Sequence, residues 1–579
     1  MKVSGVRLAG LFLVYSLLFV AFTWPLATHF TTSFVGPGGG DANQYVWNAY
    51  NFQQQVAAGH NPWFTPRLLY PVGSSLVMHT YTPIMGLANV VLRHNILAVN
   101  LCLWLSFTLS AVGAYRLCAR WVTNPVLCLL AGVAFAFTPY KLAHLPEHYH
   151  LLLTAPAPFY IYAFLEAFSF APGRLWPRVR RWSQVLLCVV LGLLTLLSDY
   201  YTLFGLLYFS VGYAAYYTLS IGRISWRRPR TWLVLTAVFV VGHIASRLLK
   251  LAGVPDNDGF WWGGDVAGYL LPPLNNRWLG TPATAALQQS DIFSMPGSVE
   301  NVMFMGYALL VVLVLSLCLP RQRQQAVAEH PEWQPLPALL LLFFLLTMPE
   351  LQIFGKNILR LPTGLLHFVP FFNNIRCPTR HVSYVALLLP LVAFVPLDRW
   401  LRAHWAWRSQ LAGAAVLLLV VLVEYQPNPM PLQTVAQVPR VYREAASLPG
   451  AGLFTIPFGL LDGYRQLGRV NPDELFYQTF HHKALSSAYI SRVPAAAFAS
   501  FDHDPVVHAL LTVQTHPDTV LTTIPTSAQV AVFLQTYQPA AFVIYPDYRN
   551  TPVHRLLREL LQSQGYREES VDNYIRLRR

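Results

Sequence analysis

The chain alternates long apolar stretches with short basic connectors, and this alternation constrains its fold more than any other feature. A helix needs roughly 20 apolar residues to cross the hydrocarbon core of a bilayer, and several of the stretches approach that length. We therefore predict a polytopic α-helical membrane protein with about eleven transmembrane helices. The eleven stretches are residues 8–29, 96–117, 125–138, 151–170, 185–198, 202–220, 232–251, 302–319, 336–346, 382–395 and 411–423.

The composition agrees with a membrane protein, since 54% of the residues are hydrophobic and only 11% are charged. The net charge of +14 does not indicate nucleic-acid binding, because the basic residues are spread over many connectors. The six cysteines lie within or beside apolar stretches without paired metal-binding spacing, so we interpret them as packing residues. The first stretch is long enough for a retained helix rather than a cleaved signal peptide.

The charges of the connectors predict the orientation, because basic connectors stay on the cytoplasmic side. With the N-terminus inside, the cytoplasmic connectors carry Arg116, Arg120, Arg174, Arg178, Arg180, Arg181, Arg223, Arg227, Arg228, Arg230, Arg321, Arg323, Arg399, Arg402 and Arg408. The outer segments carry Asp41, Glu147, Asp199, Asp265, Glu300 and Glu350. An odd number of crossings then places the C-terminus outside the inner (plasma) membrane.

Two domains are predicted from the change in pattern near residue 424. Residues 1–424 form the transmembrane domain, with long outer loops at 30–95 and 252–301. Residues 425–579 begin with a proline-rich linker and contain no spanning stretch. Buried strands are expected at 453–457 and 541–545 and a helix at 554–564, so this segment is predicted to be a small soluble α/β domain on the extracytoplasmic face of the membrane.

Asp41 follows a flexible Gly/Pro lead-in at the start of the first outer loop. Asn43, Tyr45 and Trp47 come next, at spacings suited to an interfacial helix. Aromatic faces with amide and carboxylate groups are typical of sugar-binding sites, so this segment is a candidate for catalysis and substrate binding. Alternatively, Asp41 caps the following helix and the aromatic residues are interfacial anchors.

The segment 139–150 contains several titratable residues at a predicted membrane boundary. His144 and His148 fit the H-x-x-E-H pattern of zinc peptidases, but Pro146 between them disfavours the helix that such a site needs. We instead predict that Lys141, His144 and His148 form a cationic cluster for a lipid phosphate. A solvated cap between two helices is the alternative.

Two arginines, Arg376 and Arg380, lie at the outer end of a predicted crossing, against the usual bias. Guanidinium groups bind phosphate in a bidentate manner, which makes both residues candidates for binding an anionic lipid. The alternative is pairing with Asp199 or Glu300, because charges near the membrane usually find partners. Asp199 itself either binds substrate or caps the next helix, and Asp265 is a further candidate on the outer loop.

These motifs resemble those of the GT-C superfamily of glycosyltransferases, in particular bacterial multispanning proteins of the YfhO-like kind. The resemblance covers most of the chain and is carried by residues 40–62, 70–80 (which include His79), 136–140, 198–201, 376–380 and 477–479 with His482. It implies a sugar donor linked to polyprenyl phosphate, with Asp41 acting as general base or orienting the acceptor hydroxyl. The implied reaction is an inverting hexosyl or pentosyl transfer in the cell envelope, to a glycan, lipid or protein acceptor.

The sequence departs from the D-x-D form seen in several such enzymes, because residue 43 is Asn. A divalent metal such as Mg or Mn therefore stays an open alternative, and no metal ligand is assigned. The competing functional class is a non-enzymatic transporter or assembly protein for lipid-linked saccharides. Transporters bind substrate near the bilayer midplane, whereas the ionisable residues here are predicted to gather at one face, which favours an enzyme.

Overall fold

The computed structural model describes residues 5–172, 174, 176–223, 228–251, 263–369, 372, 375–463, 465–493 and 495–579. Residue contacts divide the chain into two compact units. The helical unit comprises Met1–Pro25 with Leu103–Met430, and the α/β unit comprises Leu26–Cys102 with Pro431–Arg579. Residues 252–262 of the predicted outer loop 252–301 lie outside the described residues.

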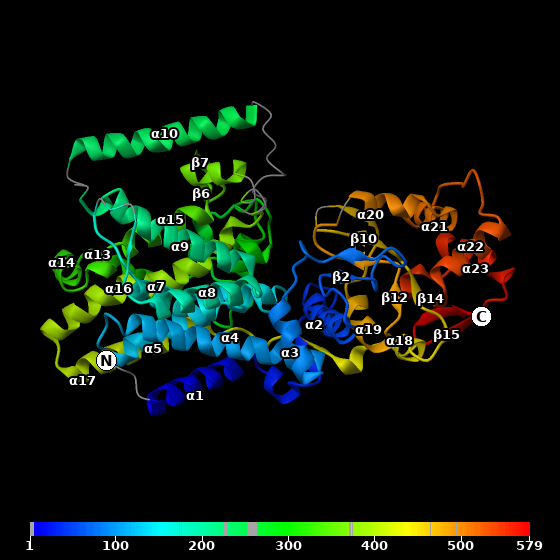
Figure 1. Cartoon of the computed structure of the whole chain (residues 1–579), viewed down its shortest axis with the longest axis horizontal. Coiled ribbons are helices and arrows are strands. Elements are labelled where there is room, and N and C mark those ends of the chain that lie inside the picture. Colours follow the sequence, from blue (N-terminus) through cyan, green and yellow to red (C-terminus); the bar gives the residue numbers. More distant parts are fainter. Residues whose placement is uncertain are drawn as a thin grey trace. The chain divides into compact units, whose positions relative to one another are not determined.

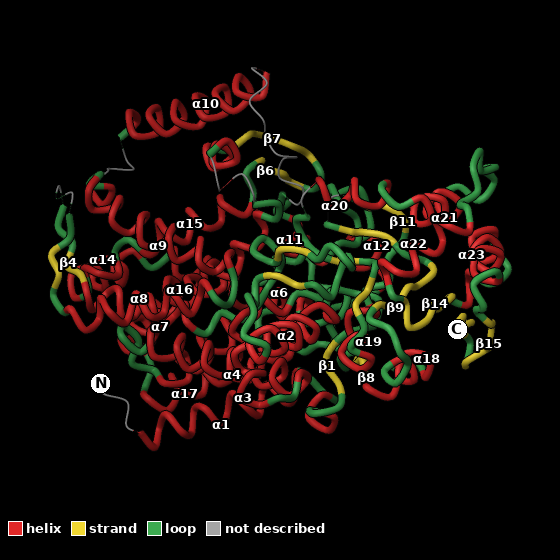
Figure 2. The backbone as a smooth tube through the Cα atoms, turned by 45° about the vertical axis from the view of Figure 1, so that its right-hand side comes forward, coloured by secondary structure: helices red, strands yellow, loops and turns green. Residues whose placement is uncertain are grey.

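The helical unit is built mainly from helices, which are red in Figure 2. Each of the eleven apolar stretches contains a helix, and several helices begin at a proline, whose fixed φ suits the first turn. The helices are α1 (Gly5–Phe22), α4 (Asn95–Cys118), α5 (Pro125–Ala136), α6 (Pro139–His144), α7 (Pro156–Ala167), α8 (Trp182–Leu196), α9 (Tyr200–Thr218), α10 (Pro229–Leu251), α11 (Ala267–Leu270), α12 (Pro282–Gln288), α13 (Tyr307–Leu317), α14 (Pro320–Glu329), α15 (Leu336–Thr347), α16 (Val382–His404) and α17 (Trp407–Tyr425). Two hairpins pair β4 (Phe168–Ser169) with β5 (Arg178–Val179), and β6 (Glu350–Ile353) with β7 (Lys356–Arg360).

Four segments among the described residues are long and apolar enough to cross a membrane: Asn95–Cys118, Pro125–His144, Pro378–His404 and Trp407–Tyr425. Shorter apolar helices cover Val6–Phe22, Pro83–Leu92, Trp182–Leu196, Thr231–Ala245, Tyr307–Leu317 and Pro331–Thr347. The count of about eleven crossings therefore stays a prediction.

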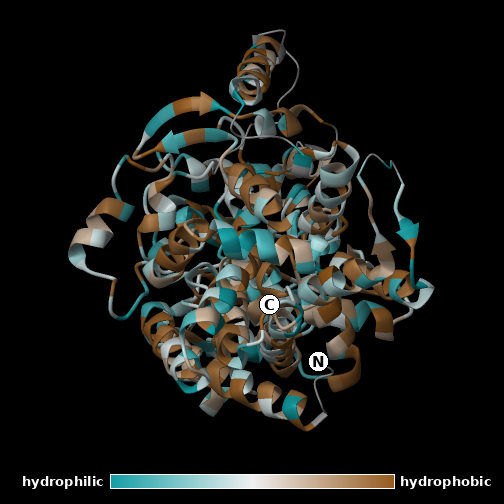
Figure 3. Ribbon diagram, turned by 90° about the vertical axis from the view of Figure 1, so that its left-hand side faces the viewer, coloured by the Kyte–Doolittle hydropathy of each residue, from teal (hydrophilic) through white to brown (hydrophobic). Residues whose placement is uncertain are grey.

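Apolar residues on the outer helices are exposed, which suits contact with lipid. On α17, Val416 and Leu419 are each 61% exposed and Val423 is 51% exposed. Figure 3 shows hydrophobic residues in brown along the helices. By contrast, α16 is almost entirely buried and forms the centre of the helical unit. An extended apolar surface such as that of α17 marks a region that faces a membrane or a partner.

The connectors predicted to be cytoplasmic are joined by ion pairs. Arg120 and Arg181, from two different connectors, contact opposite carboxylate oxygens of Glu166 at 2.5 and 2.8 Å. Asp398, at the far end of α16, accepts backbone hydrogen bonds from Thr123 (3.2 Å) and Asn124 (3.1 Å). These contacts join the connectors to one another, and the side of the membrane on which they lie stays a prediction.

The C-terminal part of the α/β unit contains a five-stranded sheet in the order β12-β9-β14-β16-β15. Here β9 is parallel to β12 and β14, whereas β14, β16 and β15 are antiparallel neighbours, with Phe542 opposite both Phe454 and Leu577. The strands are β9 (Gly452–Ile456), β12 (Ala484–Leu485), β14 (Pro539–Ile544), β15 (Arg567–Val571) and β16 (Tyr574–Arg578). The helices are α18 (Arg440–Ala445), α19 (Asp473–His481), α20 (Ala495–Ala499), α21 (Pro505–Thr515), α22 (Ser527–Tyr537) and α23 (Pro552–Gln562). Strands and a helix thus occupy the three places expected from the sequence.

Residues 26–102 fold together with this C-terminal segment instead of forming a separate loop. Strand β1 (Ser33–Val35) pairs with β8 (Leu432–Thr434), and α2 (Ala42–Ala57) packs against α3 (Pro83–Leu92) and α19. Figure 1 shows α2, in blue, beside α19, in orange. Short strands β2 (Phe64–Thr65) and β3 (Ser74–Ser75) pair with each other, and β10 (Gly459–Leu461) lies between β11 (Gln466–Gly468) and β13 (Ala488–Tyr489).

Candidate functional site

A buried ion pair between Arg380 and Glu300 is the centre of the candidate site in the helical unit. Arg380 lies in a 3-10 turn (Pro378–His381) just before α16, and Glu300 lies in another (Val299–Asn301) before α13. Nε of Arg380 is 3.0 and 3.1 Å from the two carboxylate oxygens of Glu300, and Nη2 donates a further hydrogen bond. The two side chains are only 11% and 5% exposed. Arg380 is thus paired with Glu300, as one of the two sequence-based alternatives predicted.

His144 contacts the same carboxylate from the end of α6. Its Nε2 lies 3.5 Å from Oε2 of Glu300, and its Nδ1 is 2.9 Å from the backbone oxygen of Tyr140. Because a carbonyl oxygen only accepts, the proton of His144 belongs on Nδ1. Nε2 faces the Glu300 carboxylate.

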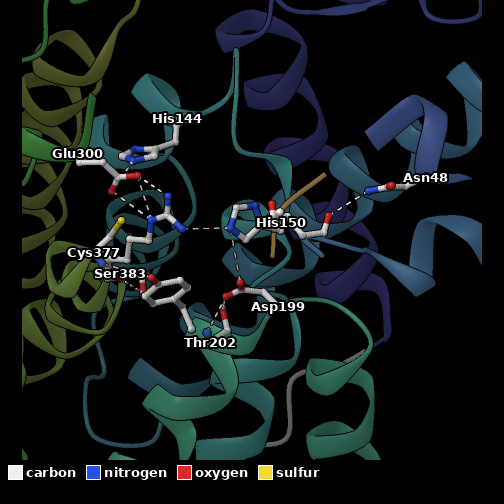
Figure 4. A network of polar contacts seen from close by, with 12 residues as sticks. Asn48, His144, His150, Asp199, Thr202, Glu300, Cys377 and Ser383 are labelled. Atoms are coloured by element: carbon white, nitrogen blue, oxygen red, sulfur yellow. Dashed lines mark hydrogen bonds and ion pairs between the residues drawn. The ribbon is translucent and has the colours of Figure 1, made fainter. Parts of the chain in front are cut away.

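His150 links the ion pair to Asp199, as Figure 4 shows. Nη1 of Arg380 is 3.4 Å from Nε2 of His150, and this nitrogen is 4.0 Å from Oδ1 of Asp199. Asp199 also caps α9, since its Oδ2 accepts from the backbone N (2.6 Å) and the hydroxyl (2.8 Å) of Thr202. The predicted site residues Asp199, His144 and Arg380 therefore belong to one network.

The electrostatics of this network follow from burial and from the charge of Arg380. Burial alone would raise the pKa of Glu300, but Arg380 and His144 hold it well below its usual range. Burial and the positive charge of Arg380 lower the pKa of His148 to about 3 and that of His150 well below its ordinary value. Glu300 is therefore ionised and both imidazoles are neutral at physiological pH. Burial raises the pKa of Asp199 to about 6.

Arg376 is a second, partly exposed cation in this region. Its charge reaches the network, because it contributes to lowering the pKa of His148. Glu300 neutralises the charge of Arg380, and Arg376 adds a second cation to the region. Asn373 and Asn374, which precede it, lie outside the described residues.

His144, His148 and Glu300 form a group that could bind a metal ion. One ligand atom from each residue lies within 4.8 Å of the others. Two imidazoles with a carboxylate are typical of zinc, whereas Mg and Mn prefer oxygen ligands. However, the guanidinium of Arg380 already contacts both oxygens of Glu300, so a bound cation would have to share or displace it. The residues therefore fit Mg or Mn poorly, and they fit zinc only if Arg380 moves.

Two other predicted site residues have different surroundings. The ammonium of Lys141 is buried, donates to Thr154 Oγ1 at 2.5 Å and lies 4.2 Å above the ring of Phe135. Asp265 accepts backbone hydrogen bonds from Ala267 (2.7 Å), Phe354 (3.0 Å) and Gly355 (2.8 Å). Its carboxylate thus joins the segment before α11 to the β6–β7 turn.

Asp41 belongs to the α/β unit, where it occupies the N-cap position of α2. Its carboxylate makes no capping hydrogen bond, so the interpretation of this side chain as a helix cap is wrong. Instead, the hydroxyl of Tyr489 donates to Oδ1 of Asp41. The preceding turn depends on Gly38 and Gly39, whose φ values of +83° and +66° are strained for other residues.

The predicted sugar-binding residues after Asp41 are mostly buried in the core. Tyr45 and Trp47 have no exposed surface, and the indole N–H of Trp47 donates to Gln478 of α19 at 2.5 Å. Asn43 donates to Asp473 of α19 at 2.8 Å. In this structure α2 is therefore a core helix and not an interfacial one, because its aromatic rings pack against protein. A fully covered ring cannot stack on a sugar.

His79 is also buried, and both of its ring nitrogens have partners. Nε2 lies 3.2 Å from Oδ1 of Asn48 on α2, and Nδ1 accepts from the backbone N of Ser491 at 3.1 Å. Burial lowers the pKa of His79 to about 3, so the ring is neutral. These contacts give His79 a role in holding the α/β unit together.

The chain matches the model of one known protein family. Residues 8–425 match the model of a family described as a domain of unknown function, DUF6311. The chain belongs to the DUF6311 family. No curated protein matches this DUF6311 chain in sequence.

Several solved structures are similar to the DUF6311 chain, with TM-scores below 0.5. ArnT from Cupriavidus metallidurans bound to undecaprenyl phosphate is 12% identical, over 99% of this chain and 98% of that one, with a TM-score of 0.44. The oligosaccharyltransferase of Archaeoglobus fulgidus, in complex with Zn and sulfate, is 11% identical over 93% and 68%, with a TM-score of 0.40. The mycobacterial arabinofuranosyltransferase AftD is 15% identical over 98% of this chain but 39% of that one, with a TM-score of 0.44.

Two residues of the candidate sites in this DUF6311 protein, His150 and Tyr489, were not predicted from the sequence. His150 carries a weak signal, because it follows His148 by two residues at a predicted helix boundary. Tyr489 carries none, since 448 positions separate it from Asp41. Glu300 was considered only as an alternative partner for arginine.

Proposed function

We propose that this chain is a membrane glycosyltransferase that moves a sugar from a polyprenyl-phosphate donor to an acceptor on the outer face of the membrane. The observation that carries the proposal is the buried network of Arg380, Glu300, His144, His150 and Asp199. These residues come from four segments that the predicted topology places on one side. Ionisable groups buried in a membrane protein are costly and usually serve function.

The chemistry of this network suits a phosphate leaving group. A departing phosphate carries negative charge, which fixed cations in a site shielded from water stabilise strongly. Arg380 and Arg376 both lower the pKa of His148, and the imidazoles of His148 and His150 are neutral. These neutral rings add hydrogen-bonding capacity without further charge, which suits a site that must release the phosphate after reaction.

Asp41 is the proposed general base. It accepts the proton of the acceptor hydroxyl while the hydroxyl oxygen bonds to the anomeric carbon of the sugar. The bond from that carbon to the phosphate oxygen breaks with inversion, and its electron pair leaves on the polyprenyl phosphate. The negative charge that develops on the phosphate is the charge that a fixed cation would stabilise.

The proposal also includes the topology of the chain, its location in the cell and its relatives. These features are about eleven crossings, a cytoplasmic N-terminus, a C-terminal domain outside the inner membrane, and a place among YfhO-like proteins of the bacterial cell envelope. The acceptor is a glycan, a lipid or a protein. A bound metal is not needed to neutralise Glu300, because Arg380 already does so.

The experiment is incubation of the purified full-length protein, in proteoliposomes, with a panel of radiolabelled polyprenyl-phosphate hexoses and pentoses plus a membrane extract as acceptor. We expect at least one donor to lose its label to a new product. A folded protein that consumes no donor would contradict the proposal. Movement of intact labelled donor across the bilayer would instead favour the transporter alternative.

A further inference from the structure

The turn that carries Asp41 is held from one side by α19. Oδ1 of Asp473 accepts hydrogen bonds from the backbone N of Gly39 (2.6 Å) and from Nδ2 of Asn43 (2.8 Å). Nε2 of Gln433 donates to the same oxygen at 3.2 Å. Asp473 therefore holds the backbone on both sides of Asp41 through contacts of its own.

Tyr489 approaches the Asp41 carboxylate from β13. Strand β13 is parallel to β10, with Tyr489 opposite Leu461, and the backbone N of Ile490 donates to Leu461 at 3.0 Å. The next residue, Ser491, donates to His79, which in turn contacts Asn48 of α2. The strand that carries the hydroxyl and the helix that follows the carboxylate are thus joined, and the geometry between them is constrained.

Both side chains remain partly exposed, unlike the buried residues around them. The Tyr489 hydroxyl donates to Oδ1 of the Asp41 carboxylate. A hydrogen bond donated to a carboxylate stabilises its ionised form. Such a bond would both orient the base and keep it unprotonated before each reaction.

We propose that Tyr489 is a positioning residue that aims and ionises Asp41, so that the C-terminal segment completes the active site. This inference rests on the proposed function, in which Asp41 is the general base. It gives the C-terminal segment a catalytic purpose beyond binding an acceptor or a partner protein.

The test compares Tyr489→Phe with Asp41→Asn and with a matched control. Tyr442→Phe is the control, because it removes a hydroxyl that donates to Tyr545 at 2.7 Å in the same unit. For Tyr489→Phe we expect kcat for labelled donor to fall about 10- to 100-fold, as for loss of a hydrogen bond to a charged group. The KM for donor should stay unchanged. In a plot of kcat against pH, the acidic limb should move to higher pH. The reason is that loss of the hydrogen bond from Tyr489 raises the pKa of Asp41.

The outcomes separate this inference from the proposed function. A Tyr489→Phe protein with the wild-type rate and acidic limb, alongside an inactive Asp41→Asn protein, would overturn the inference alone. An active Asp41→Asn protein would overturn the proposed base, and this inference with it. Should Tyr489→Phe melt far below Tyr442→Phe, Tyr489→His provides the second variant. It restores a donor, and recovery of rate and pH profile supports the inference, whereas a stable but unrecovered protein contradicts it.

Discussion

The guanidinium of Arg380 contacts both carboxylate oxygens of Glu300, with Nε 3.0 and 3.1 Å away, in the interior of the helical unit. Removing one partner of a buried pair leaves an uncompensated charge. The pair therefore has two roles in this account: it holds the segments before α13 and α16 together, and it places a cation beside the neutral imidazoles.

Arg380→Met should destabilise the protein by about 3–5 kcal/mol, because Glu300 would remain buried and ionised without its partner. Arg376→Gln is the matched variant, since it removes a guanidinium four residues before Arg380. It should reduce donor turnover with little change in melting temperature. Thermal unfolding in detergent measures both effects, and an Arg380→Met protein that melts like the wild type would contradict the role given to the pair.

Metal removal should have little effect on transfer, because Arg380 already neutralises Glu300. We expect protein treated with EDTA, and assayed without added Mg or Mn, to keep at least about half of its rate. The control is His148→Ala, which removes one of the three possible metal ligands. A rate that collapses with EDTA and returns with zinc, but does not return in His148→Ala, would show a metal site that displaces Arg380.

Stability should depend on pH through Asp199, whose pKa burial raises from 3.8 to about 6. Because the folded protein binds this proton more tightly than the unfolded chain, the contribution is complete below about pH 3.8. It is lost as the pH rises through about 6, at ~1.4 kcal/mol per pH unit. Asn also caps helices, so Asp199→Asn should fold and lack this slope. Melting curves between pH 4 and 7 compare the two proteins, and identical slopes would count against a buried Asp199 with a raised pKa.

The elements were more predictable from sequence than their assembly. The length of each apolar stretch predicted a helix, and the pattern around Phe454 and Phe542 predicted buried strands. Both predictions depend only on residues that are close together in the sequence. The pairing of Asp41 with Tyr489 is not local, since no periodicity links positions 448 residues apart. The burial of Trp47 was also missed, because an aromatic residue has the same pattern in an interfacial helix and in a core helix.

The sequence reduced the possible partners of Arg380 to a few carboxylates, but it did not show which of them is the partner. A cation near the membrane needs a counter-charge or an anionic ligand, and Glu300 and Asp199 were both open. The structure brings Glu300 into direct contact and places His150 between Arg380 and Asp199. That choice depends on how α9, α13 and α16 pack, which composition and spacing do not encode.

Transfer of label by wild-type and Asp41→Asn proteins, inserted equally into the same liposomes, decides whether Asp41 is the general base. General base catalysis typically contributes about 10²- to 10⁴-fold. We predict a loss of that size for Asp41→Asn with the melting temperature nearly unchanged, because Asp473 holds the turn independently. Transfer by Asp41→Asn at a rate close to wild type would contradict the account.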